Sequence, residues 1–587
     1  MEPITEEVKI MLLLGFFSGF LFLTLLLHKR SEKLRSAVLI GYNFLFAAIV
    51  LTLRQLGGEA FSFEAVLNAF LRAIYATPML ITFNGDLSDT ADVQDLIMIL
   101  FISVYTFRTA VRLIFRKTVL AVKTGARVLF RSSVNILWGD GADAAAMIEE
   151  IRKNEKRAAV VWIPFDRDDA QEPDAFAATP DYFRKLRRRK RYTVVLLPDP
   201  QDGNPARLRQ LEQTVPDGTD IRVTAFIRDD TLRLDQFCFP KLDLCLMSRE
   251  ALAADILIRK ERPVCLALNR GYAVTDGVRV PNGPFRLCIV GFSAFSRAIL
   301  LQSCENAAFE TAEGKGFEAT VFCRSGDGHE LFAFDYPALR DRIEWVCTDA
   351  GTEAAALMSL AETDAPVFDE IILSEEKTAR NMENAQRLLR TLRRSGKDPL
   401  PVIAAAVSDG DTGCGSEKAQ AAVHLIRIDR TQFSFDAVVG RSIDRDALRL
   451  HRQYCKNNPG AKPWSALDSF TQSSNRAAAA DRENKRALCP TLPASPAERE
   501  ASLWRLAKYE HLRWQTFHET HGWTRLPADA LTDAEKAAFI TKRPEEKRHA
   551  CLTDWDLLDD LPQSEPGLLK RYDYLNVAAF YEEKEET

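Results

Sequence analysis

The sequence predicts a multidomain protein with an α-helical membrane domain, two α/β domains and an all-α carboxyl-terminal domain. Three observations support this order. The first 117 residues contain long apolar runs, whereas the rest has the composition of an ordinary soluble protein. Residues 135–428 alternate between strand-like and helix-like segments, and this alternation starts twice. Residues 495–523 show one long helical period.

Composition limits the possible functions. The chain has 587 residues, enough for three or four domains. Its net charge of −5 gives no support to nucleic-acid binding. None of the eleven cysteines forms a Cys-x-x-Cys pair, so we expect reduced thiols rather than a disulfide framework or a zinc site.

Three segments are long and apolar enough to cross a bilayer: Ile10–Leu27, Ser36–Leu53 and Asp95–Phe115. Basic residues cluster after the first and the third segment, and basic clusters favour the cytoplasmic side. We therefore expect an outside amino terminus and a multi-pass protein with most of its chain in the cytoplasm. The clusters are His28, Lys29, Arg30, Lys33 and Arg35, and Arg108, Arg112, Arg116 and Lys117.

The apolar segment Phe61–Phe83 cannot be a fourth crossing without moving one basic cluster to the outside. It is therefore expected to re-enter the bilayer from the outer side or to lie there as an interfacial helix. This layout resembles the pore region of two-span cation channels, which implies a filter at Thr82, Phe83, Asn84, Gly85 and Asp86. Phe83 replaces a filter glycine, which argues against potassium selectivity.

The first α/β domain opens with a strand at Asn135–Trp138. The turn that follows reads Gly139-x-Gly141-x-x-Ala144, and the next strand, Ala158–Phe165, leads into Asp166. This pattern between a strand and a helix is typical of a dinucleotide-binding turn. Two aspartates in the turn, Asp140 and Asp143, would repel a pyrophosphate. Further strands are expected at Tyr192–Leu197, Asp220–Phe226 and Leu242–Leu246.

The second α/β domain opens in the same way with a strand at Arg286–Gly291. Its turn reads Gly291-x-Ser293-x-x-Ser296, with serines at the later two positions of the pattern. A copy without a nucleotide is the favoured alternative here. Further strands are expected at Ala319–Arg324, Ile343–Cys347, Asp369–Leu373, Val402–Ala406 and His424–Ile428.

Two such units behind a pore-like segment resemble the tandem Rossmann-like regulatory domains of calcium-gated potassium channels and potassium-uptake regulators. The resemblance covers residues 135–430. It implies a possible nucleotide or dinucleotide ligand and a homo-oligomeric ring, with a tetramer favoured.

The carboxyl-terminal domain is organised around one helix from Ser495 to Trp523. A capping box of Ser495 and Glu498, with Pro496 at the first position, predicts its start, and Gly522 predicts its end. An apolar stripe on this helix contains Glu510, whose carboxylate must be paired or used. The stripe is Leu503, Leu506, Glu510, Trp514 and Phe517.

This region resembles the Ryr domain, the repeat named after ryanodine receptors and also found in bacteria. The resemblance covers residues 463–581 in three blocks, which centre on Ser474-Asn475-Arg476, on residues 508–514 with Gly522-Trp523, and on residues 547–573. It implies a small helical module with an aromatic and polar cavity that in bacteria senses a nucleotide-like ligand. Together with the predicted spans, it leads us to expect a protein of the bacterial inner membrane. The implied site comprises Trp464, Asn475, Arg476, Glu510, His511, Trp514 and Trp523.

Two other interpretations of these residues remain open. The tryptophans could simply be core. A metal site at His511, His518 and His521 is disfavoured, because the spacing is not that of a zinc motif and no cysteine is near.

The predicted domains are 1–118 (membrane), 119–275 and 276–435 (Rossmann-like), 436–462 (helical linker) and 463–587 (Ryr-like). No nucleophile motif or Walker lysine is present, so we do not expect an enzyme. Two functions remain: a ligand-gated membrane effector with a cation pore, or a membrane-anchored nucleotide-binding regulator or enzyme without conduction. Partners would be the bilayer and a small nucleotide-like ligand, with no nucleic acid. The sequence does not distinguish a defence effector from a housekeeping channel.

Overall fold

The computed structural model describes residue 42 and residues 125–582, apart from gaps at 166–172, 174, 229–238, 313, 325, 327, 350–351, 363–367, 376–377, 397–399, 408–422, 428–433 and 458–459. The chain divides into two compact units, residues 1–126 and 127–587. Apart from Tyr42, the predicted spans lie outside the described residues, as do the Phe61–Phe83 segment and the filter residues 82–86. Among the residues that are described, no helix combines the length and apolar character needed to cross a membrane.

The first sheet has six parallel strands in the order β3-β2-β1-β4-β5-β6. Numbered along the chain, this is the 3-2-1-4-5-6 order of a Rossmann fold, which confirms the predicted class of this domain. The strands are β1 (Ser133–Trp138), β2 (Val160–Ile163), β3 (Phe176–Ala177), β4 (Arg191–Leu196), β5 (Asp220–Phe226) and β6 (Asp243–Met247).

Helices cover both faces of this sheet because its strands are apolar on both faces. Leu137 packs with the α6 helix (Gly141–Asn154), whereas its neighbour Ile136 packs on the opposite face with the α7 helix (Asn204–Thr214). The short α16 helix (Phe435–Val438) returns from the end of the second domain to join α6.

The second sheet repeats the same architecture. Its parallel strands run in the order β13-β12-β9-β14-β15-β16, which again is 3-2-1-4-5-6 along the chain. The strands are β9 (Phe285–Val290), β12 (Phe317–Arg324), β13 (Ile343–Thr348), β14 (Glu370–Leu373), β15 (Val402–Val407) and β16 (His424–Arg427).

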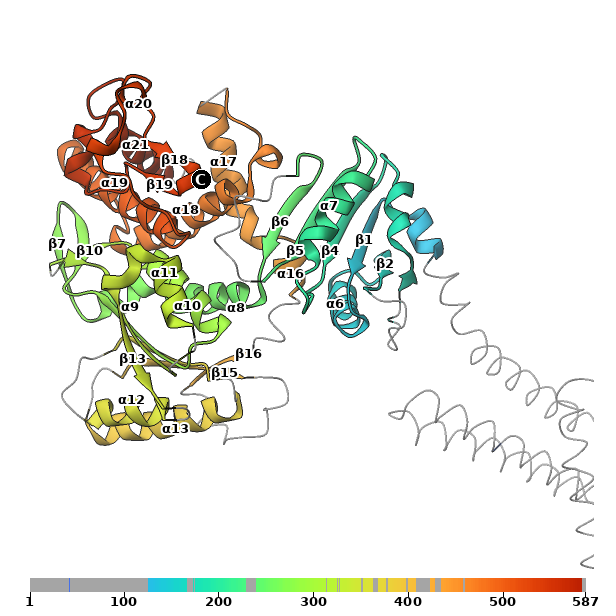
Figure 1. Cartoon of the computed structure of the whole chain (residues 1–587), viewed down its shortest axis with the longest axis horizontal. Coiled ribbons are helices and arrows are strands. Elements are labelled where there is room, and N and C mark those ends of the chain that lie inside the picture. The colour runs from blue at the N-terminus through green and yellow to red at the C-terminus, as the bar shows by residue number, and fades with distance from the viewer. Residues whose placement is uncertain are drawn as a thin grey trace, which may run out of the picture. The chain divides into compact units, whose positions relative to one another are not determined.

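The two faces of the second sheet have different partners (Figure 1). One face carries α12 (Glu353–Glu362) and α13 (Thr378–Arg394). The other face carries α10 (Ala294–Asn306) and α11 (His329–Asp335). On this second face the core also takes in α8 (Arg249–Lys260) and α9 (Pro263–Asn269), which precede the domain in sequence.

The same core continues into the carboxyl-terminal helices α18 (Ser469–Leu488), α19 (Pro496–Glu519) and α21 (Leu568–Glu582). The two α/β domains and the helical region therefore share packing within one compact unit. The α17 helix (Ser442–Asn457) links them in sequence.

The prediction of an all-α carboxyl-terminal domain is wrong in one detail. Three strands of two residues each, β17 (Thr524–Arg525), β18 (Lys542–Arg543) and β19 (Arg548–His549), form a small sheet. Such short strands lack the alternation of apolar and polar residues that predicts a strand from sequence. Two hairpins were also unforeseen, β7–β8 (Tyr272–Thr275 and Val278–Pro281) and β10–β11 (Glu310–Thr311 and Gly314–Lys315).

The predicted long helix is present as α19, but its expected capping box is wrong. Ser495 is the N-cap residue and makes no side-chain capping bond. This end of the helix is exposed, so water can satisfy its amide groups. At the other end Gly522 has φ +78°, and the Trp523 amide donates to the His518 carbonyl at 2.9 Å.

Candidate ligand site

A cavity of about 220 Å³ lies where the two α/β domains meet the carboxyl-terminal helices. Residues at the ends of β5 and β6 contribute to it, together with one face each of α8, α10, α18 and α19. Much of its wall is apolar, which suits a flat or hydrophobic ligand group. These apolar residues include Leu246, Met247, Leu252, Ala298, Leu301, Ile443, Ala477, Ala480 and Phe517.

A smaller hollow of about 70 Å³ adjoins this cavity and has a different character. Arg476 and Ala480 line both spaces, so the two are contiguous. Six arginines line the smaller hollow against three carboxylates, and this excess favours anions. The arginines are Arg259, Arg262, Arg449, Arg476, Arg482 and Arg486, and the carboxylates are Asp255, Asp446 and Glu483.

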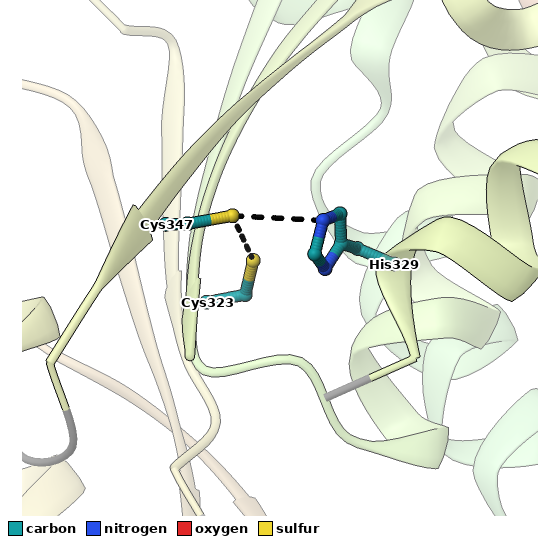
Figure 2. Close-up of side chains that lie close together, drawn as sticks. All are labelled: Cys323, His329 and Cys347. Atoms are coloured by element: carbon teal, nitrogen blue, oxygen red, sulfur yellow. Dashed lines mark hydrogen bonds between the residues drawn. The ribbon is translucent and has the colours of Figure 1, made fainter. Parts of the chain in front are cut away.

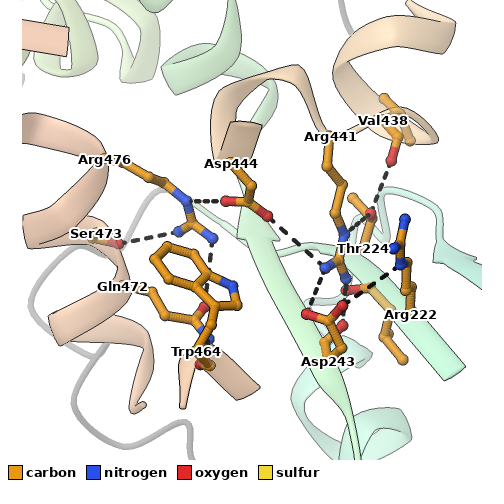
Figure 3. A network of polar contacts seen from close by, with 11 residues as sticks. Arg222, Thr224, Asp243, Val438, Arg441, Asp444, Trp464, Gln472, Ser473 and Arg476 are labelled. Carbon is orange, nitrogen blue, oxygen red and sulfur yellow. Dashed lines mark hydrogen bonds and ion pairs between the residues drawn. The ribbon is translucent and has the colours of Figure 1, made fainter. Parts of the chain in front are cut away.

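Arg476 is held in place at this boundary by the helical linker (Figure 3). Its Nε donates to Asp444 at 2.6 Å, and its Nη1 donates to Ser473 at 3.4 Å. Its guanidinium carbon lies 5.8 Å from the centre of the Trp464 ring. A guanidinium fixed in this way keeps a planar set of donors that fits a phosphate or a carboxylate.

The cavity wall contains several charged groups that were not predicted, among them Glu305 and Arg513. Burial raises the pKa of Glu305 to about 7, although a hydrogen bond from Thr520 at 2.6 Å and the charge of Arg513 oppose the rise. Arg513 is 4 % exposed, and its Nη1 has no hydrogen-bond partner among the described residues. A buried donor of this kind is costly, and a ligand acceptor in the cavity would remove that cost.

Of the seven residues predicted from the Ryr resemblance, only Arg476 lines the cavity. Glu510 lies behind the wall and contacts Lys485 at 2.6 Å and Arg513 at 2.7 Å. Glu510 thus pairs with cations from its own helix and from α18, which meets the expectation that its carboxylate must be paired or used. Its carboxylate holds the Arg513 guanidinium in place in the cavity wall.

The other predicted residues lie in two clusters away from the cavity lining. Trp464 packs beneath Arg476, and the Asn475 side chain donates to the carbonyl of Thr471 at 2.9 Å. His511 stacks with Trp514 at 5.9 Å. Trp523 packs tilted against Phe470 at 5.8 Å. Most of these aromatics therefore serve packing inside the helical region, as the core interpretation expects.

The first glycine turn, which contains Gly139, Gly141 and Ala144, joins β1 to α6, but it is closed. The Asp140 carboxylate accepts from the Ala142 amide at 2.7 Å and so occupies the amino terminus of α6. A Cβ at Gly139 would lie 2.4 Å from Leu197, so this glycine is needed for strand packing. A phosphate here would have to displace a carboxylate. Asp166 lies outside the described residues.

The second turn is closed by its own serines. Ser293 and Ser296 form a reciprocal capping box at the start of α10. Ser296 also donates to the Gly291 carbonyl at 2.7 Å and contacts Ser374 across the point where the strand order reverses. Gly291 has φ +87°, and a Cβ there would lie 2.8 Å from the Glu375 backbone. This arrangement favours the interpretation of a structural copy.

Comparisons with known proteins show no family for this chain. No family model matches the chain, and no curated protein matches it. A crystal structure of GsuK bound to ADP is 13 % identical over 70 % of this chain and 98 % of that chain, with a TM-score of 0.30. A D-isomer specific 2-hydroxyacid dehydrogenase from Xanthobacter autotrophicus Py2 is 13 % identical over 54 % of this chain and 97 % of that chain, with a TM-score of 0.20. Scores this low carry no functional argument, and the Rossmann-like assignment of both domains rests on their strand orders.

Proposed function

We propose that this protein is a ligand-gated membrane effector that senses a small anionic, nucleotide-like molecule. The molecule would bind in the 220 Å³ cavity between the α/β domains and the carboxyl-terminal helices, here called the junction cavity. The observation that carries the proposal is the composite cavity, since an apolar space adjoins an arginine-lined hollow. A base would occupy the larger space and a phosphate the smaller one, with Arg476 between them. The Ryr-like region would supply part of the sensor, and the predicted membrane domain would supply the pore.

A chain of buried polar contacts offers a route from the cavity to the first sheet (Figure 3). Arg476 pairs with Asp444, which lies 3.8 Å from Arg441. Arg441 in turn pairs with Asp243 on β6 at 2.8 Å. The Thr224 hydroxyl on β5 donates to the Val438 carbonyl at 2.9 Å. A ligand that draws Arg476 away from Asp444 would leave a carboxylate only 1 % exposed without its closest cation, and this favours a second arrangement of α17.

Direct binding to the purified full-length protein tests the proposal. Isothermal titration with AMP, ADP, ATP, cyclic AMP and NAD⁺ should identify at least one ligand. At a hundredfold excess over the dissociation constant, that ligand should stabilise the protein by about 2.7 kcal/mol.

A matched pair of variants locates the binding site. Ala480 lines both hollows, whereas Ala478 is a partly buried residue of the same helix that lines neither. Ala480→Phe should abolish binding and Ala478→Phe should preserve it. The proposal fails if none of the five nucleotides binds, or if Ala480→Phe binds with unchanged affinity.

A further inference from the structure

Two cysteines and a histidine converge at the carboxyl edge of the second sheet (Figure 2). Cys323 on β12 and Cys347 on β13 are direct neighbours in the parallel register. His329, the first residue of α11, faces them. These are the one group of three potential metal ligands in the described part of the chain. The sequence analysis expected no zinc site, because the strand register and not a short motif brings the cysteines together.

The distances match those expected around a tetrahedral zinc ion. With Zn–S bonds near 2.3 Å and Zn–N bonds near 2.05 Å, tetrahedral angles place two sulfurs about 3.8 Å apart and a sulfur and a nitrogen about 3.6 Å apart. The Sγ atoms of Cys323 and Cys347 are 3.8 Å apart, and Cys347 Sγ lies 3.6 Å from His329 Nε2. All three ligand atoms lie within 4.8 Å of one another.

The surroundings provide an apolar shell on one side and access on the other. Trp345 lies 5.6 Å from the His329 ring and packs against Phe292 and Phe332. Such a shell limits solvent around a metal. Cys323 is buried and Cys347 is exposed, so an ion could enter from the side of Cys347.

We propose that Cys323, His329 and Cys347 bind one Zn²⁺ ion, with a fourth position open to water or another ligand. Two thiolates would balance the charge of the ion, and binding would release their protons. The ion would join α11 to the β12 and β13 edge of the second sheet. This site is independent of the junction cavity, because none of its three residues lines either hollow.

Cobalt substitution tests the site in the reduced full-length protein. Co²⁺ bound by two thiolates gives sulfur-to-metal charge-transfer absorption, and about one equivalent per chain should saturate it before Zn²⁺ displaces it. Cys347→Ser should lower the affinity at least about tenfold and weaken the band, and His329→Ala should lower the affinity while leaving a thiolate band. Cys347 is exposed and His329 is partly buried, so both variants should fold.

Cys455→Ser is the matched control. It removes a thiol that lies 3.4 Å from His451, a Cys–His contact without a third ligand in the described residues. Binding should be unchanged in this variant. The proposal is overturned if Co²⁺ gives no charge-transfer band, or if Cys347→Ser binds like the unaltered protein. A Cys323–Cys347 disulfide as the sole species under mild reduction would also overturn it and assign the pair to redox chemistry.

Discussion

Replacing Glu510 by glutamine should destabilise the carboxyl-terminal helical region, because it removes the negative charge from a buried group of ions. Glu510 is 5 % exposed and accepts hydrogen bonds from Lys485 and Arg513. Lys485 keeps Asp481 as a second partner, but Arg513 would lose its principal carboxylate. The glutamine has nearly the same shape, so the change creates little cavity and tests mainly the charge.

Two independent considerations give similar values for the loss of folding stability in Glu510→Gln. Burial alone would raise the pKa of Glu510, but the charges and hydrogen bonds of Arg513 and Lys485 outweigh it and lower the pKa to about 2. A fall from an ordinary value of 4.5 corresponds to about 3 kcal/mol in favour of the ionised form. Removal of one member of a buried ion pair typically costs about 3–5 kcal/mol. We therefore expect Glu510→Gln to cost about 3 kcal/mol.

Urea unfolding followed by tryptophan fluorescence measures this cost, since five of the eight tryptophans lie in residues 463–587. Glu500→Gln, at an exposed position of the same helix, should change stability by less than about 0.5 kcal/mol.

The depressed pKa of Glu510 also sets the pH range in which the ion pairs stabilise the protein. The stabilisation is complete above pH 4.5 and is lost as the pH falls towards 2. Equal stability of Glu510→Gln and Glu500→Gln at pH 7 would refute the reasoning.

Three further predictions address the cavity, the linker and the predicted membrane domain. Nucleotide affinity should rise as the pH falls through about 7, because protonation of Glu305 removes a negative charge from the cavity wall. Titration calorimetry measures this change, and the Glu305→Gln variant should show no such pH dependence. Asp444→Asn should lower the free energy of unfolding by about 3 kcal/mol, as measured by urea unfolding. Asp446→Asn, at an exposed position, should leave the free energy of unfolding nearly unchanged. Similar losses of stability in the two variants would contradict the role given to the chain of buried polar contacts. Cysteines placed at Gln55 and Thr90 should both react with an impermeant maleimide from outside, and labelling from opposite sides would contradict the re-entrant segment.

The two sheets were predictable because their strands are apolar on both faces. The segment Asp220–Phe226 was predicted to the residue, and the other long strands begin and end within about two residues of the prediction. The strand β3, with two residues, was missed because so short a segment carries no periodicity.

The cavity could not be read from the sequence, because its lining comes from segments between Ile227 and His521 that meet only through domain packing. The sequence showed that Glu510 needs a partner but not which one. Arg513 lies three residues later on the same helix face, a spacing that could have been recognised. Lys485 lies on another helix, and its approach depends on tertiary structure. Arg476, which was named from its position in the resemblance, lines the cavity, whereas most of the aromatics named with it pack inside the helical region.

Ion flux from liposomes containing the purified protein tests the central claim that occupation of the junction cavity controls a pore. The measurement compares flux with and without the nucleotide identified by titration, for the unaltered protein, Ala480→Phe and Ala478→Phe. The account predicts a nucleotide-dependent cation flux in the unaltered protein and in Ala478→Phe, and none in Ala480→Phe. No flux in any condition, or a nucleotide response that persists in Ala480→Phe, would contradict it; absence of flux combined with intact binding would favour a membrane-anchored regulator.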